Sequence, residues 1–258
     1  MEKMPAVFVG HGDPMIALKR NEITETLNKI GKEIIKKHGE PKAILCISAH
    51  WFTKDTFIQS AEFPKQIYDM YGFPDELYEV KYPVKGSKEL TNEVENILGN
   101  DVKINDDWGI DHGAWTIFVH MFPEAKIPVV QLSVNAYLSS EDSYRLGEKL
   151  AKLREKGYLI VGSGNIVHNL RKIKWDNPKG SQEADKFDKY ILDSISKRED
   201  EKVRKYEEHE YSNYAVPTPD HFIPILYILG ASQGEKPYIF NEMRELGSLS
   251  MTSYAFGL

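Results

Sequence analysis

Three histidines follow short apolar runs in a pattern that favours a shared site. His11 comes two residues after the run AVFV, and His50 comes two residues after AILCIS. His168 lies beyond the run YLIV and the sequence GSGN, which we expect to form a flexible turn. Ligands of open α/β sheets bind beyond the carboxyl ends of the strands. If the three runs are parallel strands, these side chains meet at one edge of the sheet.

Two further histidines can reach the same edge. We expect Thr218-Pro219 to open a helix, as N-cap and first residue, with His221 as its third residue. His112 lies in the glycine-flanked loop DHG. One histidine at a strand end is usually a structural residue, but several at ends of the same polarity favour metal binding. Neutral imidazoles with open positions suit catalytic zinc or ferrous iron.

The other candidate groups are expected to be structural. We expect His38 to be a solvated helix cap, His120 to pack inside an apolar helix, and His209 to be exposed in a charged run. The GSGN sequence lacks the glycines of a nucleophile elbow and of a dinucleotide-binding fingerprint. Its glycines instead allow the backbone to approach the site closely. Cys46 is expected to be a buried thiol, because its neighbours are apolar.

The elements that must position these side chains alternate between strand and helix. Apolar runs predict strands, and apolar residues at helical spacing predict helices. Strands joined by helices form parallel pairs with a right-handed crossover, so we predict one α/β domain. The predicted strands are 6–9, 43–48, 128–134, 158–161 and 249–256, and the predicted helices are 15–37, 87–98, 116–122, 139–157, 181–210 and 218–229.

Two features have alternative interpretations. Residues 61–86 combine aromatic residues with Pro64, Pro74 and Pro83, and the segment is too long for a simple connector. It is either a lid over a flat ring or a segment that packs against the sheet. Asp13, two residues after His11, either orients a ligand imidazole or forms a turn before Pro14.

Composition limits the class of protein. The chain has 258 residues, of which 41% are hydrophobic and 28% charged, as in ordinary globular proteins. Its formal net charge of −6 argues against nucleic acid as a partner, and no apolar run is long enough for a membrane span. A single cysteine excludes an internal disulfide framework. We therefore predict a cytoplasmic protein without nucleic-acid or membrane partners, and leave open whether it forms a homo-oligomer.

Eight ordered sequence blocks carry a resemblance to a known family. They are MPAVFVGHGDPM, SAHWFT, YGFPDELYEVKYP, WGIDHGAW, VQLSV, GSGNIVHNLR, PTPDHFIPILYILGA and GSLSM. Together they resemble the bacterial DOPA 4,5-dioxygenase-like proteins. These are class III extradiol ring-cleaving dioxygenases, in the superfamily of the protocatechuate 4,5-dioxygenase catalytic subunit. The resemblance extends from Met4 to Met251.

The resemblance implies a single catalytic domain, residues 1–258, around a central mixed, largely parallel sheet flanked by helices. It implies metal-dependent extradiol cleavage of a catechol-type, DOPA-like aromatic by dioxygen, which opens the ring to a semialdehyde. The implied metal is Fe(II), with Zn(II) bound in some relatives, and the implied ligands are His11, His50 and His221. His168 corresponds to the acid–base histidine, which some relatives use as a fourth ligand, and His112 to a residue that contacts substrate.

This activity is consistent with the residue types present. A base must take a proton from the catechol and an acid must protonate the leaving oxygen, and histidine can do both near neutral pH. Two other functions remain open. A histidine site can hold zinc for hydrolysis, although no carboxylate partner is evident beside these histidines. The fold can also serve a non-catalytic interaction protein, although all the histidine motifs are intact here.

Overall fold

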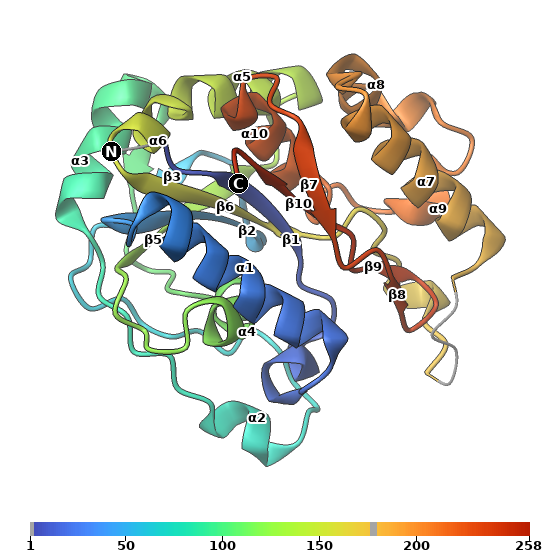
Figure 1. Cartoon of the computed structure of the whole chain (residues 1–258), viewed down its shortest axis with the longest axis horizontal. Coiled ribbons are helices and arrows are strands. Elements are labelled where there is room, and N and C mark those ends of the chain that lie inside the picture. Colours follow the sequence, from blue (N-terminus) through green and yellow to red (C-terminus); the bar gives the residue numbers. More distant parts are fainter. Residues whose placement is uncertain (1–2, 176–179) are drawn as a thin grey trace.

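The core of the protein is a mixed sheet that is mostly parallel. The computed structural model describes residues 3–175 and 180–258. Its strands are β1 (Ala6–Gly10), β2 (Ala43–Thr53), β3 (Phe57–Ile58), β4 (Lys103–Ile104), β5 (Val129–Asn135), β6 (Tyr158–Gly164), β7 (Pro237–Phe240), β8 (Arg244–Glu245), β9 (Leu249–Ser250) and β10 (Ser253–Phe256). In the described residues, eight strands form the main sheet in the order β4-β3-β5-β2-β6-β1-β10-β7, and β8 and β9 form a separate pair (Figure 1).

The four central strands are parallel, and the antiparallel pairings lie toward the edges. β2 pairs in parallel with β5 and β6, and β6 pairs in parallel with β1. β10 is antiparallel to both β1 and β7. The predicted single α/β domain with a mixed, largely parallel sheet is therefore confirmed. All carboxyl ends of the central strands point to the same edge, as the sequence analysis required.

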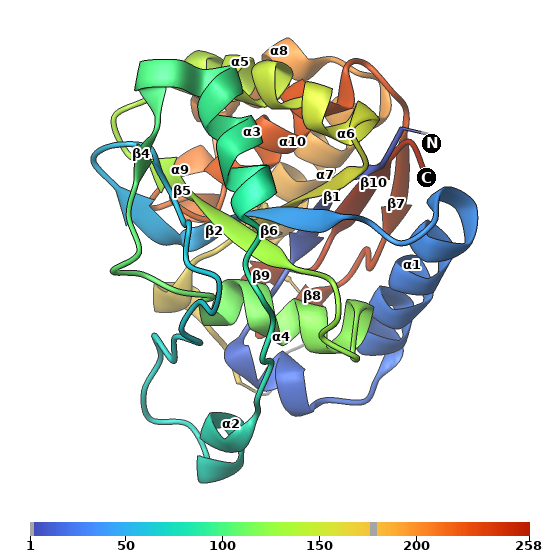
Figure 2. The same ribbon diagram turned by 90° about the vertical axis from the view of Figure 1, so that its left-hand side faces the viewer.

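Helices cover both faces of this sheet. They are α1 (Glu22–His38), α2 (Asp75–Glu79), α3 (Lys88–Leu98), α4 (His112–Met121), α5 (Ser140–Leu150), α6 (Lys152–Glu155), α7 (Gln182–Ser196), α8 (Asp200–Arg204), α9 (Ser212–Ala215) and α10 (Ile223–Ser232), with 3-10 turns at Pro14–Leu18, Gly99–Asp101, Leu170–Lys172 and Tyr206–Glu208. α1 and α4 lie on one face, and α3, α5 and α10 lie on the other (Figure 2). α7, α8 and α9 group together at one end of the molecule (Figure 1).

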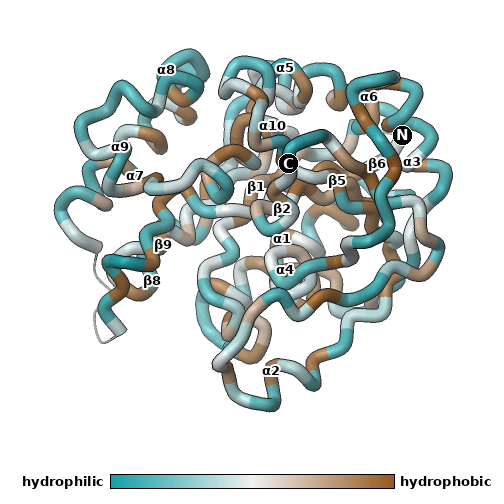
Figure 3. Tube along the Cα trace, turned by 180° about the vertical axis from the view of Figure 1, so that it is seen from behind, coloured by the Kyte–Doolittle hydropathy of each residue, from teal (hydrophilic) through white to brown (hydrophobic). Residues whose placement is uncertain are grey.

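Side chains along each central strand alternate between two hydrophobic cores. Val7 and Val9 face the core beneath α1 and α4, whereas Ala6 and Phe8 face the core that α10 fills. This alternation follows from the twofold periodicity of a strand, and burial on both faces explains the continuous apolar runs. Figure 3 shows hydrophobic residues along the central strands and hydrophilic residues over the outer helices.

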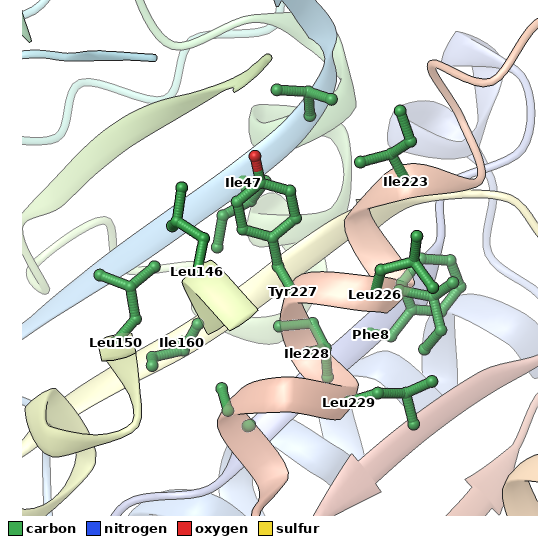
Figure 4. Packing of buried hydrophobic residues seen from close by; sticks show 14 of the residues in the cluster. Phe8, Ile47, Leu146, Leu150, Ile160, Ile223, Leu226, Tyr227, Ile228 and Leu229 are labelled. Carbon is green, nitrogen blue, oxygen red and sulfur yellow. The ribbon is translucent and has the colours of Figure 1, made fainter. Parts of the chain in front are cut away.

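α10 packs especially closely against its neighbours. All ten of its residues are buried, and Tyr227, Ile228 and Leu229 lie among side chains of the sheet and α5 (Figure 4). Two glycines allow this approach, because a Cβ on Gly147 would lie 2.1 Å from the Tyr227 carbonyl oxygen and one on Gly230 would lie 2.0 Å from that of Tyr144. A larger side chain at either position would separate the two helices.

Several predicted helices are interrupted. The helix expected over 15–37 begins only at Glu22, where Asn21 and Thr24 form a capping box. The helix expected over 139–157 divides at Ala151. The charged helix expected over 181–210 ends at Ser196, because Arg198 adopts a left-handed conformation with φ 58°. The Arg198 guanidinium binds Ser232, the Glu235 backbone and Asp200, and these tertiary contacts outweigh local helix propensity.

The C-terminal segment contains more strands than predicted. The strand expected over 249–256 is divided into β9 and β10, and β7 and β8 were not predicted. The short strands β3 and β4, at one side of the main sheet, were also missed. Among the described helices, none is both long and apolar enough to cross a membrane.

Candidate metal centre

The structure brings three of the predicted ligands together. The ligand atoms of His11, His50 and His221 all lie within 4.8 Å of one another. Their ring centroids form a nearly equilateral triangle, with separations of 5.0 Å, 5.1 Å and 5.1 Å. Such a group can bind one face of a metal ion and leave the opposite positions open. The sheet edge therefore carries a possible metal site.

His50 is positioned by an irregularity inside a strand, not by the strand end. β2 continues to Thr53, so the expected end of this strand at Ser48 was wrong. Ser48 pairs with Ser133 and Phe52 pairs with the next residue of β5, which leaves the three residues 49–51 without partners there. An irregularity of this kind re-aims a side chain. Gly113 makes room for it, since a Cβ there would lie 2.7 Å from Ser48 Oγ and 3.2 Å from His50 Cδ2.

The GSGN sequence also differs from its prediction. Gly162, Ser163 and Gly164 are the buried end of β6 and pair with β1, so they are not a flexible turn. The expected close approach is confirmed. A Cβ on Gly164 would lie 2.2 Å from the His221 carbonyl oxygen, which accepts a hydrogen bond from the Asn165 N–H at 2.9 Å.

His221 lies in a turn before α10, so the predicted helix opening at Thr218-Pro219 was wrong. The N–H groups of Phe222 and Ile223 both donate to the Pro219 carbonyl, which closes a turn. The helix begins at Ile223, and Pro224 occupies its first turn, where its missing N–H costs no helical hydrogen bond. The His221 carbonyl accepts from Asn165, the residue directly after β6, which holds His221 against the sheet edge.

Each of the three imidazoles is oriented through its Nδ1 atom. His50 Nδ1–H donates to Asp69 Oδ2 at 2.7 Å, and His221 Nδ1–H donates to Asp220 Oδ2. Ser163 Oγ donates its only proton to the Gly113 carbonyl, so it accepts from His11 Nδ1–H at 2.9 Å. In its neutral form, each of the three rings therefore keeps the lone pair on Nε2 for a ligand. Hydrogen bonds of this kind orient metal-binding histidines in proteins.

The spacing of the Nε2 atoms fits a shared ion. His50 Nε2 and His11 Nε2 are 3.3 Å apart. Two lone pairs at this distance repel each other unless a proton or a cation lies between them. Two nitrogens bound at about 2.0–2.1 Å to one ion lie roughly 2.8–3.4 Å apart for bond angles between right and tetrahedral. The donors present are thus compatible with one first-row metal ion.

His112 joins this group through Asp69. His112 is the first residue of α4, which starts at the N-cap Asp111 and not at Thr116 as predicted. Asp69 Oδ1 accepts from the His112 N–H at 2.9 Å and lies 3.0 Å from His112 Nδ1. The same carboxylate holds His50, and the two rings pack at 3.8 Å between centroids. His50, Asp69 and His112 therefore form a second set of donors that shares one residue with the first.

His168 lies against the metal-site group without joining it. Its ring stacks on that of His221, with centroids 3.5 Å apart and an interplanar angle of 4°. Imidazole lone pairs lie in the ring plane, so an ion in the plane of one stacked ring is well out of the plane of the other. This geometry does not support His168 as a fourth ligand. It leaves the ring at the cavity wall, where a bound substrate can reach it.

Burial and hydrogen bonding set the charge state of these rings. Burial, together with the neighbouring histidines, holds the pKa of His11 and of His221 well below the ordinary value. Burial also lowers the pKa of His168 to about 4. Burial opposes protonation of His50, but Asp69 and Asp111 outweigh it and raise the pKa of His50. The hydrogen bonds from His112 and His50 overcome burial and keep the pKa of the Asp69 carboxyl far below its usual range.

Asp13 does not orient a ligand imidazole. Its Oδ1 accepts from the Met15 N–H at 2.8 Å, and its Oδ2 pairs with Lys19 Nζ at 2.9 Å. The turn-forming alternative is the correct one. The orienting residues that sequence analysis missed are Asp69, Ser163 and Asp220. Asp220 directly precedes His221 and was visible in the sequence, whereas Asp69 lies in an irregular segment whose path no pattern predicts.

A cavity of about 790 Å³ opens above the histidines. Part of the aromatic segment 61–86 lines it, including Met70, Tyr71 and Phe73, whereas Tyr82 packs in the core beneath α4. The two interpretations of this segment therefore apply to different parts of it. Residues 69–74, in the middle of the segment, form a cavity wall, and Tyr82 and Val84 near its end pack in the core.

The residues expected to lie outside the site do so. His120 binds the Ile16 carbonyl through Nε2 at 2.8 Å, and Cys46 is buried in β2. His209 was expected to be exposed but is half-buried, with its ring 4.5 Å from that of Tyr190. It packs against Phe187 and Tyr190 of α7, outside the cavity.

Comparison with known proteins identifies the family. Residues 5–257 match the family described as the catalytic LigB subunit of aromatic ring-opening dioxygenase. The chain is 38% identical to a 4,5-DOPA dioxygenase extradiol of Escherichia coli (strain K12), covering 99% of this chain and 95% of that protein. It is 36% identical to a 4,5-DOPA dioxygenase extradiol of Beta vulgaris, covering 96% and 95%.

A solved structure shows the same fold. The crystal structure of the uncharacterized protein JW3007 from Escherichia coli K12 superposes with a TM-score of 0.86, at 37% identity, covering 99% of this chain and 100% of that one. The chain belongs to the LigB family of aromatic ring-opening dioxygenases. The predicted class, an extradiol dioxygenase enzyme, is thereby confirmed, and the family implies a small aromatic substrate and dioxygen.

Proposed function

We propose that residues 1–258 form one catalytic domain that cleaves a catechol-type, DOPA-like aromatic ring. The reaction breaks the ring bond beside the two hydroxyl-bearing carbons and adds both atoms of one dioxygen, which gives an open-chain semialdehyde. No other reductant is needed, because the catechol supplies the electrons. Two relatives named as DOPA dioxygenases, each about as long as this chain, support this class of substrate.

The proposed metal ligands are His11, His50 and His221, each through Nε2. We propose Fe(II) as the active metal, with Zn(II) able to occupy the same ligands without supporting oxygen chemistry. One ring nitrogen from each of the three histidines converges at one end of the cavity, and each Nδ1 is held by Ser163, Asp69 or Asp220, which leaves Nε2 as the ligand atom. This convergence is the observation that carries the proposal. When bound, the ion would hold both catechol oxygens and dioxygen in neighbouring positions.

The proton transfers are assigned to His168, with His112 orienting the substrate. Burial keeps the His168 imidazole neutral, and a neutral ring can accept the catechol proton and later return it to the leaving oxygen. Stacking on His221 fixes its distance from the site. Asp69 holds His112 and His50 together, so the residue that meets substrate and a proposed ligand keep a constant relative position.

Oxygen uptake by the reconstituted protein tests this function. Protein purified without oxygen and loaded with Fe(II) is mixed with 4-methylcatechol in aerated buffer. We expect one dioxygen consumed per catechol and a yellow product, and no uptake by the zinc-loaded protein. Absence of uptake with every catechol tested, in protein that retains one Fe(II), would overturn the proposal. Metal-dependent hydrolysis of an ester panel would favour a zinc hydrolase instead.

The remaining proposals concern the location, partners and oligomeric state of the enzyme. We propose a cytoplasmic location, based on the single cysteine, which is a free buried thiol, and on the acidic net charge. We also propose that neither nucleic acid nor a membrane is a partner, and that any homo-oligomer leaves the cavity open. Gradient sedimentation of the purified protein determines its oligomeric state.

A further inference from the structure

We propose that Asp111 is a positioning residue for the metal centre, which holds the start of α4 against two strands and thereby sets the placement of His11 and His50. This inference rests on the proposed function, because it concerns two of the proposed ligands. It goes beyond that function by assigning a role to a fully buried side chain, one that the described residues lining the cavity do not include.

The Asp111 side chain makes more contacts than a helix cap requires. Its Oδ1 accepts from the Ala114 N–H at 3.2 Å, which caps α4. The same oxygen accepts from Ser48 Oγ at 2.7 Å. Its Oδ2 accepts from Trp108 Nε1 at 3.1 Å and from the side-chain amide of Gln131. A cap needs only the first of these four bonds, so the other three hold the helix start against other elements.

All four partners are donors, so a carboxylate fits this position and a carboxamide does not. Gln131 Oε1 accepts from the Asp111 N–H at 3.0 Å, which fixes the Gln131 amide with Nε2 toward the carboxylate. An asparagine at this position would place an NH₂ group against the Ala114 N–H or against the N–H groups of Trp108 and Gln131. Because the position is fully buried, water cannot separate the opposed donors.

Ser48 connects Asp111 to the irregularity that aims His50. It is the last residue of β2 that pairs with β6, and its pairing with β5 resumes only at Phe52. Ser48 Oγ accepts from the His50 N–H at 3.3 Å while it donates to Asp111 Oδ1. The carboxylate therefore fixes the hydroxyl that binds the backbone of His50.

A second serine connects the same helix start to His11. Ser163 of β6 pairs with Ser48 in the sheet, and its hydroxyl donates to the Gly113 carbonyl. Ser163 Oγ also accepts from His11 Nδ1–H at 2.9 Å. Gly113 lies two residues after Asp111, in the first turn of α4. A shift of this turn would move the carbonyl that orients the hydroxyl beside His11.

The helix start is thus a common reference for ligands on two different strands. Metal ligands have to be held to within about 0.5 Å of their working positions. Asp111 acts on the ion through His50 and His11, although it is not a ligand. Its loss should therefore change the geometry of the bound ion as well as the stability of the fold.

Co(II) binding by Asp111→Asn tests this inference without turnover. Co(II) is titrated into the metal-free protein against a fluorescent chelator, and the visible spectrum is recorded because its bands depend on ligand geometry. We expect about 10–100-fold weaker binding, as for other residues that orient metal ligands, and a changed spectrum. Wild-type affinity and spectrum in Asp111→Asn overturn the proposal.

Ser139→Ala is the matched control. The Ser139 side chain caps α5, which lies on the opposite face of the sheet from α4 (Figure 2). Its removal costs a helix cap without touching the metal centre, so both the Co(II) affinity and the spectrum should stay as in the wild type. An equal change in both variants would assign the effect to general destabilisation and overturn the proposal.

A second variant isolates one connection. Ser48→Ala removes a single hydroxyl, and we expect about three- to tenfold weaker Co(II) binding. The double variant should bind no more than about twofold more weakly than Asp111→Asn, because both residues act on His50 through one connection. Losses that multiply would show independent action and contradict the proposal. Wild-type affinity in Ser48→Ala overturns it even where Asp111→Asn does not fold.

The result is separable from ring cleavage. Wild-type protein that binds Co(II) but consumes no oxygen when loaded with Fe(II) rejects only the proposed reaction. Oxygen uptake by the Fe(II) protein, with unaltered Co(II) binding in Asp111→Asn, rejects only the role of Asp111.

Discussion

The histidine floor of the cavity and its rim are built in opposite ways. The floor, defined as His11, His50, His112, His168 and His221, is fixed by strands, a helix start and hydrogen bonds to Ser163, Asp69 and Asp220. The rim, defined as Tyr71, Leu170 and Trp175, belongs to irregular segments and a 3-10 turn and is largely exposed. Regular elements and hydrogen bonds hold the proposed metal centre, whereas loops carry the exposed side chains at the opening of the cavity.

Removal of a floor ligand should have the largest effect. His11→Ala eliminates one of three Nε2 donors, so we expect loss of bound Fe(II) and an activity at least about 10³-fold lower. Dye-based iron quantification and oxygen-electrode rates measure both. His209→Gln is the matched control, because this histidine packs on α7 outside the cavity. Full iron content in His11→Ala would show that His11 is not a metal ligand.

Loss of the acid–base group should affect turnover but not metal binding, so its total effect is smaller than that of ligand loss. We expect His168→Gln to keep bound Fe(II) and to lower kcat by roughly 10²–10⁴, the usual contribution of positioned proton transfer. The same iron and oxygen assays separate the two effects. Iron loss as complete as in His11→Ala would make His168 a ligand and shift the proton transfer to His112. Unchanged iron and kcat would reject the assignment entirely.

An orienting residue should have an intermediate effect. Asp69→Asn keeps the size of the side chain but weakens its hydrogen bonds to His50 and His112, so we expect about 10–100-fold weaker metal binding. Competition with a fluorescent chelator measures the affinity. Asp13→Asn is the control, since Asp13 binds a turn and Lys19 instead of an imidazole. Equal losses in both variants would indicate a general loss of fold.

A rim substitution should have the smallest effect. Tyr71 is almost fully exposed, so Tyr71→Ala should change the free energy of unfolding by no more than about 0.5 kcal/mol. Iron content should stay constant, and KM for 4-methylcatechol should rise several-fold at unchanged kcat. Denaturant melts and steady-state kinetics test this. A large fall in kcat would mean that Tyr71 takes part in the chemistry. The functional difference proposed between the rim and the floor would then be wrong.

The floor could be predicted from sequence much more fully than the rim. Apolar runs locate the central strands, and the rule for strand ends then groups His11, His50 and His168. Two features that position His50 could not be predicted. They are the irregularity in β2 and the hydrogen bond to Asp69, and both depend on tertiary contacts. The break at Arg198 has the same origin, since its guanidinium is bound by residues far along the chain. Local patterns do not encode such contacts.

The most direct test of this account is the location of the metal. Crystals of the Fe(II)-loaded protein, grown without oxygen, are measured at the iron absorption edge. We predict one anomalous peak within about 2.0–2.3 Å of Nε2 of His11, His50 and His221, with the side toward the cavity free of protein ligands. A peak between His50, Asp69 and His112, the second donor set in the structure, would contradict the proposed centre and the roles of His168 and His112 that depend on it.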